Sequence, residues 1–206
     1  MNERNILDKY LPENTIDDIY YLIKKHKVHL TISKNRLTKL GDYRPPGIKN
    51  YHRISVNHNL NPYAFIITFL HELAHLITYE QHGNSKPPHG KEWKENYREQ
   101  LIFFIKKNIF PEDLVPDLLQ HLKKIKASSH ADINLTRSLK KYNPYKEELL
   151  IENLTIGDTF IFKENRKFQL LEKLRKRYKA KEINSNKIYL FHALTPIKPY
   201  KSKSSL

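Results

Sequence analysis

The sequence predicts an α+β fold in two parts, a larger region of helices with a small sheet and a small β-rich module after it. Residues 61–82 hold one long apolar segment of helical length, and short segments that alternate apolar and polar residues precede it. From residue 149 onward, short β-type segments are separated by turn residues. A chain of 206 residues has the size of one or two domains.

The larger region is expected to begin with a helix and three strands. Asn14–Asp18 open a helix that runs to about Lys27, with its apolar residues on one side. The strands are expected at Val28–Ile32, Arg36–Tyr43 and Tyr51–Asn57.

Three more helices follow, at about 61–82, 89–106 and 111–126. The first starts at Asn61-Pro62, where a capping residue precedes a proline in the first turn. Ser128–His130 mark a boundary, and a short helix over Leu135–Tyr142 is expected to bridge to the C-terminal module.

The C-terminal module is expected to hold four strands, at Thr159–Phe162, Phe168–Leu171, Arg177–Ile183 and Lys187–Phe191. Such short strands with tight links predict a small barrel or a curled sheet. The predicted organisation is a larger domain over 1–127, a helical linker over 128–148, a basic β module over 149–197 and a disordered tail over 198–206.

The residues with the clearest chemistry are His71-Glu72-Leu73-Ala74-His75 in the long apolar helix. Residues four apart lie one turn above each other on one helix face, so His71 and His75 are placed to share a metal ion. Glu72 then lies beside the position of a metal-activated water, where a general base is needed. The pattern predicts Zn²⁺ held by both histidines, with Glu72 as the catalytic base.

The sequence around this motif favours a metal-binding role for the two histidines over a purely structural role. The surrounding helix is apolar nearly all round, which predicts that it is buried. Burying two histidines and a glutamate is costly unless they are satisfied together. The alternative is an amphipathic helix in which two core histidines form ordinary hydrogen bonds.

A catalytic zinc site usually has three protein ligands and one open position, so a third ligand is required. The metzincin pattern fails, because Gln81 occupies the position of its third histidine. His82 lies one residue further, at the expected helix end. We favour His89, which opens the next helix after a loop, over Glu95, which has the spacing of a glutamate ligand.

The two histidine motifs together resemble the SprT family of zinc metalloproteases, which includes the Spartan proteases that degrade DNA–protein crosslinks. The resemblance rests on His71–Leu76, a loop, and then His89-Gly90-Lys91-Glu92-Trp93, and Arg53–Asn57 resembles the strand ahead of the family's active-site helix. It covers roughly residues 10–127. It implies a zincin-like fold, three histidine ligands, a glutamate base and proteolysis linked to nucleic acid.

This sequence departs from many family members after that region. They carry a C-terminal zinc ribbon with four cysteines, whereas this chain has no cysteine. The absence of cysteine also excludes disulfides, which is typical of a cytoplasmic protein. No N-terminal signal and no apolar run near the roughly 20 residues of a membrane helix are evident, so we expect a soluble cytoplasmic protein without a membrane partner.

The charge predicts a polyanionic partner. The formal net charge is +15, and residues 128–206 contribute 17 basic against 8 acidic residues. Basic side chains interleaved with Phe168 and Tyr178 suit a surface that contacts phosphates and stacks bases of DNA or RNA. The candidate contacts are Arg166, Lys167, Lys173, Arg175, Lys176, Arg177, Tyr178 and Lys179. The alternative is a solvated charged face.

Two functions follow, one enzymatic and one not. The first is a zinc endopeptidase that acts on proteins near nucleic acid, with Arg53–Asn57 pairing to an extended substrate. Tyr43, Arg44 and Tyr97 are candidate donors to the reacting carbonyl. The second is a nucleic-acid-binding protein with structural zinc, which would normally need a fourth ligand. A zinc hydrolase with a non-protein substrate is a third possibility.

Overall fold

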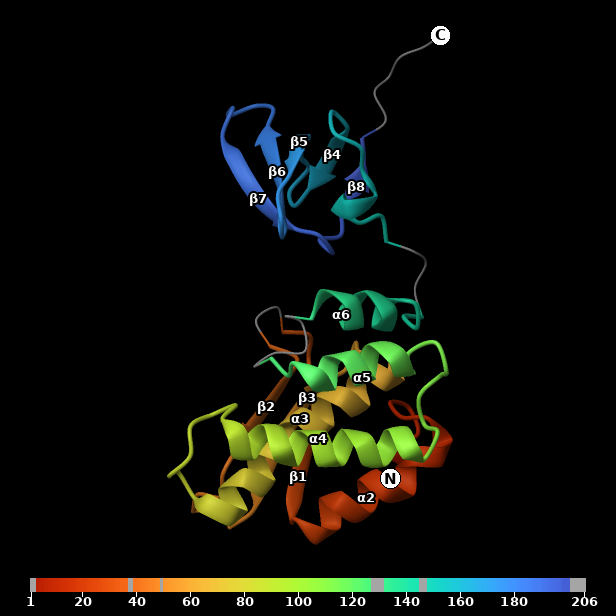
Figure 1. Cartoon of the computed structure of the whole chain (residues 1–206), viewed down its shortest axis with the longest axis vertical. Coiled ribbons are helices and arrows are strands. Elements are labelled where there is room, and N and C mark those ends of the chain that lie inside the picture. The colour runs from red at the N-terminus through yellow and green to blue at the C-terminus, as the bar shows by residue number, and fades with distance from the viewer. Residues whose placement is uncertain (1–2, 37–38, 49, 127–131, 145–147, 201–206) are drawn as a thin grey trace. The chain divides into compact units, whose positions relative to one another are not determined.

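The computed structural model describes residues 3–36, 39–48, 50–126, 132–144 and 148–200 (Figure 1). The chain divides into two compact units, residues 1–144 and 145–206. The first mixes helices with a small sheet and the second is mainly β, so the fold class is α+β. Within the described residues, no helix combines the length and apolar character needed to cross a membrane.

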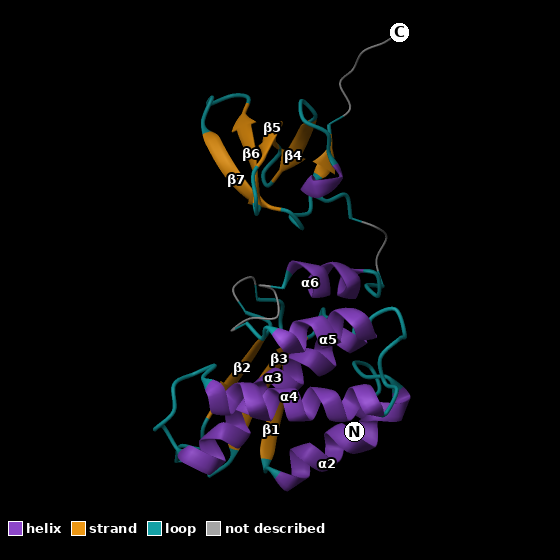
Figure 2. Ribbon diagram, viewed as in Figure 1, coloured by secondary structure: helices purple, strands orange, loops and turns teal. Residues whose placement is uncertain are grey.

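The first unit consists of six α-helices, one 3-10 helix and three strands in its described part (Figure 2). In chain order these are α1 Glu3–Leu7, η1 Glu13–Thr15, α2 Ile16–Lys25, β1 Val28–Ser33, β2 Gly41–Arg44, β3 His52–Asn57, α3 Pro62–His82, α4 Lys91–Lys106, α5 Val115–Lys123 and α6 Ile133–Lys140.

The sheet of the first unit has the order β1-β3-β2, with β1 parallel and β2 antiparallel to β3. The expected strand over Arg36–Tyr43 is therefore shorter and begins at Gly41. The expectation that Arg53–Asn57 pairs with a substrate was wrong, because β1 and β2 already occupy both edges of β3. Among the described strands, β2 is the one beside α3 with a free edge.

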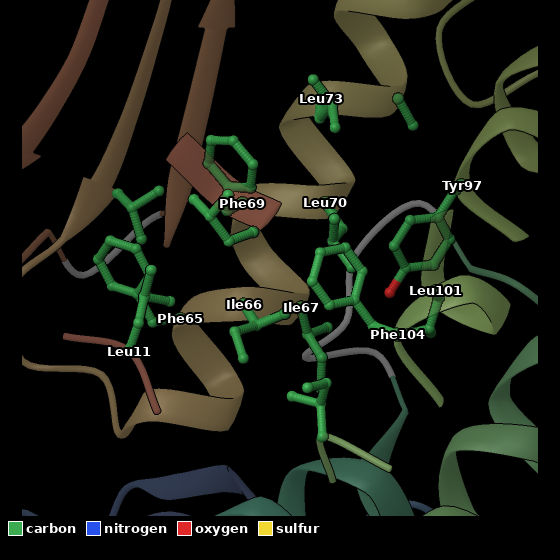
Figure 3. Packing of buried hydrophobic residues seen from close by; sticks show 14 of the residues in the cluster. Leu11, Phe65, Ile66, Ile67, Phe69, Leu70, Leu73, Tyr97, Leu101 and Phe104 are labelled. Atoms are coloured by element: carbon green, nitrogen blue, oxygen red, sulfur yellow. The ribbon is translucent and has the colours of Figure 1, made fainter. Parts of the chain in front are cut away.

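The long helix α3 forms the centre of the first unit's core. The Asn61 side chain caps it by accepting a hydrogen bond from Ala64 N at 2.9 Å, and Pro62 occupies the first turn. Figure 3 shows its apolar side chains packed toward Leu11 on one side and toward α4 on the other. The fully buried residues of α3 include Phe65, Ile66, Phe69, Leu70 and Leu73. This burial fixes the rotation of α3 and so the direction of its polar residues.

The helix that was expected to bridge the two parts, α6, packs in the first unit. Leu135 and Leu139 are buried in the same core as α3, and Asn61 Nδ2 donates to Leu139 O at 2.8 Å. The apolar face of α6 gives it a partner in this core, so the unit extends to residue 144 rather than ending at 127. The predicted boundary at Ser128–His130 lies outside the described residues.

The second unit is built on a five-stranded antiparallel sheet in the order β7-β6-β5-β4-β8. Its elements are η3 Ile151–Asn153, β4 Thr159–Phe162, β5 Arg166–Lys173, β6 Arg177–Glu182, β7 Ile188–His192 and β8 Lys198–Pro199. One face of the sheet covers a core that contains Phe160, Phe168 and Phe191. The tail was expected to be disordered from residue 198, but Lys198 and Pro199 pair with β4, while 201–206 lie outside the described residues.

Candidate metal centre and cleft

Helix α3 brings His71, Glu72 and His75 to one place. The rings of His71 and His75 lie one turn apart with centroids separated by 5.2 Å. Glu72 points toward β2 and is buried, with 7% of its surface exposed. The four-residue spacing thus produces the arrangement that the sequence predicted for these three side chains.

His89 reaches the same place from the segment between α3 and α4. Helix α3 ends at Gly83, whose φ of 58° suits glycine, and His89 itself has a left-handed φ of 59°. His89 Nε2 lies 3.0 Å from His75 Nε2 and 3.2 Å from His71 Nε2. The backward turn before α4 therefore directs the third histidine at the other two.

The rival third ligands lie elsewhere. His82 is exposed at the end of α3, and Glu95 is exposed on α4 with its carboxylate 3.9 Å from Lys91 Nζ. Among the described residues, the group able to hold a metal is His71, His75 and His89, whose ligand atoms all lie within 4.8 Å of one another. The geometry selects His89.

The histidine cluster fits a divalent cation. Burial lowers the pKa of His71 to about 3 and that of His75 to about 4, and it also lowers the pKa of His89, so all three are neutral at pH 7. Three neutral imidazoles with converging Nε2 atoms provide lone pairs for a shared cation. Tetrahedral zinc with bonds of about 2.0–2.1 Å separates ligand nitrogens by roughly 3.3 Å, close to the observed spacing.

Aromatic residues of α4 support the cluster from behind. Trp93 is fully buried, and its Nε1 donates to His71 O at 3.3 Å. Its ring centroid is 4.6 Å from the rings of both His71 and His89. Tyr97 stacks on Trp93 at 5.3 Å. These rings restrict the histidines to the converged orientation, a role that the sequence indicated only through the position of Trp93 after His89.

The environment of Glu72 is unusual for a carboxylate. Its pKa is raised to about 8, mainly by burial and also by the charge of Asp42, although Arg36 and Lys39 act in the opposite direction. The backbone N–H of Tyr43 donates a hydrogen bond to the Glu72 carboxylate. Glu72 is thus held by β2 in a position from which it can exchange a proton.

Gly41 is a site residue that the sequence analysis treated only as part of a turn. A Cβ atom at this position would lie 2.4 Å from Glu72 Oε1 and 2.8 Å from Thr68 Cγ2. Only glycine lets β2 approach α3 so closely. The available signal was a glycine inside a predicted strand, which often marks a close backbone approach.

A cleft of about 590 Å³ opens over the histidine cluster. We call this the cleft throughout. One wall is strand β2 with Lys39 and Leu40 before it, the floor is α3, and the opposite wall is the segment from Gly83 to His89. The cluster and Glu72 therefore face a space that is open to an extended ligand.

The three candidate donors to a reacting carbonyl differ in their access to the cleft and in their hydrogen-bond partners. Tyr97 is fully buried, its hydroxyl has no hydrogen-bond partner among the described residues, and it does not line the cleft. Arg44 is exposed and pairs with Asp42 at 3.0 Å. Tyr43 lines the cleft, but its hydroxyl bonds to His52 Nδ1 at 2.9 Å.

The predicted nucleic-acid contacts in the second unit do not share one surface. Tyr178 is buried with 5% exposure, so its expected stacking role was wrong, and Phe168 is buried as well. Alternation along β5 and β6 puts hydrophobic residues on the core side because the sheet has one covered face. Arg166 pairs with Glu182 at 2.7 Å and Lys173 Nζ lies over the Tyr178 ring, both toward the core side.

The remaining predicted contacts lie on the open side of the sheet or in its turn. Arg177 and Lys179 alternate with buried Tyr178 and Ala180, so they belong to the face away from the core, as Lys167 does on β5. Arg175 and Lys176 lie in the exposed turn between β5 and β6. Lys181 and Lys198 share the open face by register and were missed as candidates.

In this α+β domain, α3 carries two histidines and a buried glutamate, and the segment before α4 adds a third histidine. This combination is typical of metalloprotease-like proteins. Residues 9–101 match the family model described as the SprT-like family. The match confirms the resemblance of the two histidine motifs to this family over residues 9–101. No curated protein and no solved structure matches the chain.

Proposed function

We propose that the protein is a zinc-dependent endopeptidase of SprT-like type with a zincin-like catalytic domain. The observation that carries the proposal is the convergence of three neutral, partly buried histidines beside the buried Glu72 at the floor of an open cleft. A site built only for stability would not need a buried carboxylate beside the metal position. Zinc bound by His71, His75 and His89 would polarise the scissile carbonyl as a Lewis acid and would lower the pKa of a bound water molecule.

The chain's own residues supply proton transfer and orientation. Glu72 accepts a proton from the attacking water and later donates it to the leaving amine. The N–H of Tyr43 and the closeness of Gly41 hold the carboxylate in place. A nearby cation favours the ionised form of a carboxylate, so zinc loading would counter the burial that raises the pKa of Glu72.

The free edge of β2 favours a polypeptide substrate over a small molecule. Asn57 N donates to Leu40 O, so in the alternating antiparallel ladder the backbone groups of Gly41 and Tyr43 point away from β3. The Tyr43 N–H is already bonded to Glu72. The backbone groups of Gly41 and the carbonyl of Tyr43 remain for an extended chain that adds to the sheet edge. This placement of the substrate replaces the predicted pairing with β3.

Cleavage of an unfolded model protein such as casein tests the proposal. The zinc-loaded protein is expected to cleave it, and Glu72→Gln is expected to bind zinc equally well but to lose activity by at least about 10²–10⁴-fold. Zinc content is measured in parallel by atomic absorption. If Glu72→Gln cleaves within about tenfold of the unchanged protein, the proposed base is wrong. If neither cleaves, the alternative of a structural zinc site is favoured.

We further propose that substrates are proteins associated with nucleic acid, DNA–protein crosslinks among them, and that the second unit contacts the nucleic acid. The support is the open face of its sheet, where the described strands carry Lys167, Arg177, Lys179, Lys181 and Lys198 against one acidic residue, Glu172. Cations on a surface that lacks matching acids favour a polyanion. Cleavage assays with and without DNA test whether nucleic acid raises the rate on bound proteins.

A further inference from the structure

A chain of polar side chains runs from the cleft wall on β2 across the start of β3 to the end of α2. Tyr43 Oη and His52 Nδ1 are 2.9 Å apart. His52 Nε2 lies 3.6 Å from Glu80 Oε1, and the other Glu80 oxygen is 2.8 Å from His26 Nδ1. These contacts tie β2 to β3, to the last turns of α3 and to the end of α2. The proposed chemistry of the metal centre does not use any of them.

The charges in this chain define the direction of the Tyr43 hydrogen bond. Burial lowers the pKa of His52, which therefore is neutral at pH 7 and has one protonated nitrogen. The Glu80 carboxylate favours the proton on the nearer nitrogen, Nε2. Nδ1 is then an acceptor, and the Tyr43 hydroxyl donates to it.

Tyr43 touches the metal centre through two other parts of the same residue. Its backbone N–H donates to the Glu72 carboxylate. Its ring lies parallel to the ring of His75, with an interplanar angle of 2° and a centroid distance of 6.4 Å. Strand β2 has only four residues and one paired edge, so its own ladder holds it weakly. The side-chain bond to His52 is a third attachment of this short strand.

We propose that Tyr43 is a positioning residue for Glu72, anchored by its hydroxyl to His52 so that its backbone N–H stays on the carboxylate. The proposal rests on the role of Glu72 in the proposed function. The anchor acts on the strand, not on the substrate. Loss of the hydroxyl would let β2 shift away from α3. The Glu72 carboxylate could then move from its position beside the histidines.

Amide hydrogen exchange of the full-length protein tests the anchor without any need for hydrolysis. The amide at position 43 points at Glu72, so its exchange rate reports on that bond. We expect Tyr43→Phe to raise this rate by about tenfold, because one hydrogen bond of ordinary strength is removed. Tyr51→Phe is the matched control, since Tyr51 directly precedes β3 and its ring contacts His29 of β1, and it should leave the rate unchanged.

A pair of His52 variants separates the hydrogen bond from simple packing. An asparagine places its carbonyl near the position of Nδ1, whereas a glutamine places its amide near that of Nε2. His52→Asn should therefore keep exchange at position 43 close to the normal rate, while His52→Gln should match Tyr43→Phe. Combining His52→Gln with Tyr43→Phe should add nothing, because both remove one interaction.

Hydrolysis supplies the second readout. Tyr43→Phe and His52→Gln should each lower kcat about tenfold, with KM and zinc content unchanged, and His52→Asn should restore kcat. Unchanged exchange at position 43 in Tyr43→Phe, or equal damage in both His52 variants, overturns the proposal. If the unchanged protein cleaves no protein, the proposed function fails, and the exchange pattern alone decides whether the anchor exists.

Discussion

Gly41 controls the position of Glu72 although it lies outside the histidine cluster. It has no chemistry of its own, yet its missing side chain lets β2 touch Glu72. The buried carboxylate thus depends on a backbone approach that a single methyl group would block.

Replacing this glycine is expected to impair catalysis without removing the metal. Gly41→Ala would place a Cβ 2.4 Å from Glu72 Oε1, so the carboxylate or the strand must move. We expect kcat for protein cleavage to fall by about 10²-fold, since misplacement of a catalytic group by about 1 Å has that effect. Gly47→Ala, where nothing lies within 4 Å, is the matched control and should keep full activity and zinc content. Equal activities of the two variants would contradict the role of Gly41.

The histidines make the stability of the metal-free protein depend on pH. Their folded-state pKa values of about 3 for His71 and about 4 for His75 lie below the ordinary value of 6.5. Below pH 6.5 the unfolded chain binds protons that the folded chain does not, so stability falls with falling pH, by up to about 1.4 kcal/mol per pH unit for each histidine. Glu72 acts oppositely between pH 4.5 and about 8, because its pKa is raised.

Urea denaturation of metal-free Glu72→Gln at pH 7, 6 and 5 isolates the histidine contribution. The free energy of unfolding should decrease with acid in this background. Adding His71→Gln should make the decrease smaller, since one titrating group is gone. A decrease of the same size in both proteins would mean that His71 is not held neutral by burial.

At the scale of elements, the start of α3 joins two parts of the first unit. Asn61 caps α3 through its side-chain oxygen and binds Leu139 O and Asn143 Oδ1 through its amide, at 2.8 Å each. We expect Asn61→Ala to lower the free energy of unfolding by about 2–3 kcal/mol, because a cap and two hydrogen bonds are lost, one of them to the buried Leu139 carbonyl.

A serine at position 61 separates the contribution of the helix cap from that of the two amide hydrogen bonds. Asn61→Ser keeps a good cap but not the amide donors, so its loss should be about half as large. Chemical denaturation of both variants measures the difference. Identical losses would show that the bonds to α6 contribute nothing and that capping alone matters.

Elements with a strong local pattern were predictable from the sequence, and the elements that depend on distant partners were not. The boundaries of α3 followed from Asn61-Pro62 and Gly83, and the pairing of His71 with His75 followed from helical spacing. The order of β1, β2 and β3 depends on tertiary packing, so the edge strand was misassigned. The burial of Tyr178 depends on which face of the sheet is covered, and its basic neighbours in the sequence wrongly suggested an exposed position.

At the scale of the whole molecule, the histidine cluster and the basic sheet face belong to separate units. The histidine cluster lies in the first unit, while the second unit has its own hydrophobic core among residues 151–197, under a sheet whose other face is basic. Zinc binding and nucleic-acid binding are therefore expected to be separable by mutation.

Salt dependence of DNA binding tests this separation. Changing Lys167, Arg177 and Lys181 on the open face to glutamine should weaken binding to all sequences and reduce the slope of log K against log salt by up to about three. Lys163, Lys173 and Arg175 changed together form the control, because these cations lie in turns or toward the core side and their loss alters the net charge equally. The open-face variant should retain full zinc content and cleave casein normally. If both triple variants lower affinity equally, binding reflects net charge rather than the open face, and if neither does, the second unit does not bind DNA.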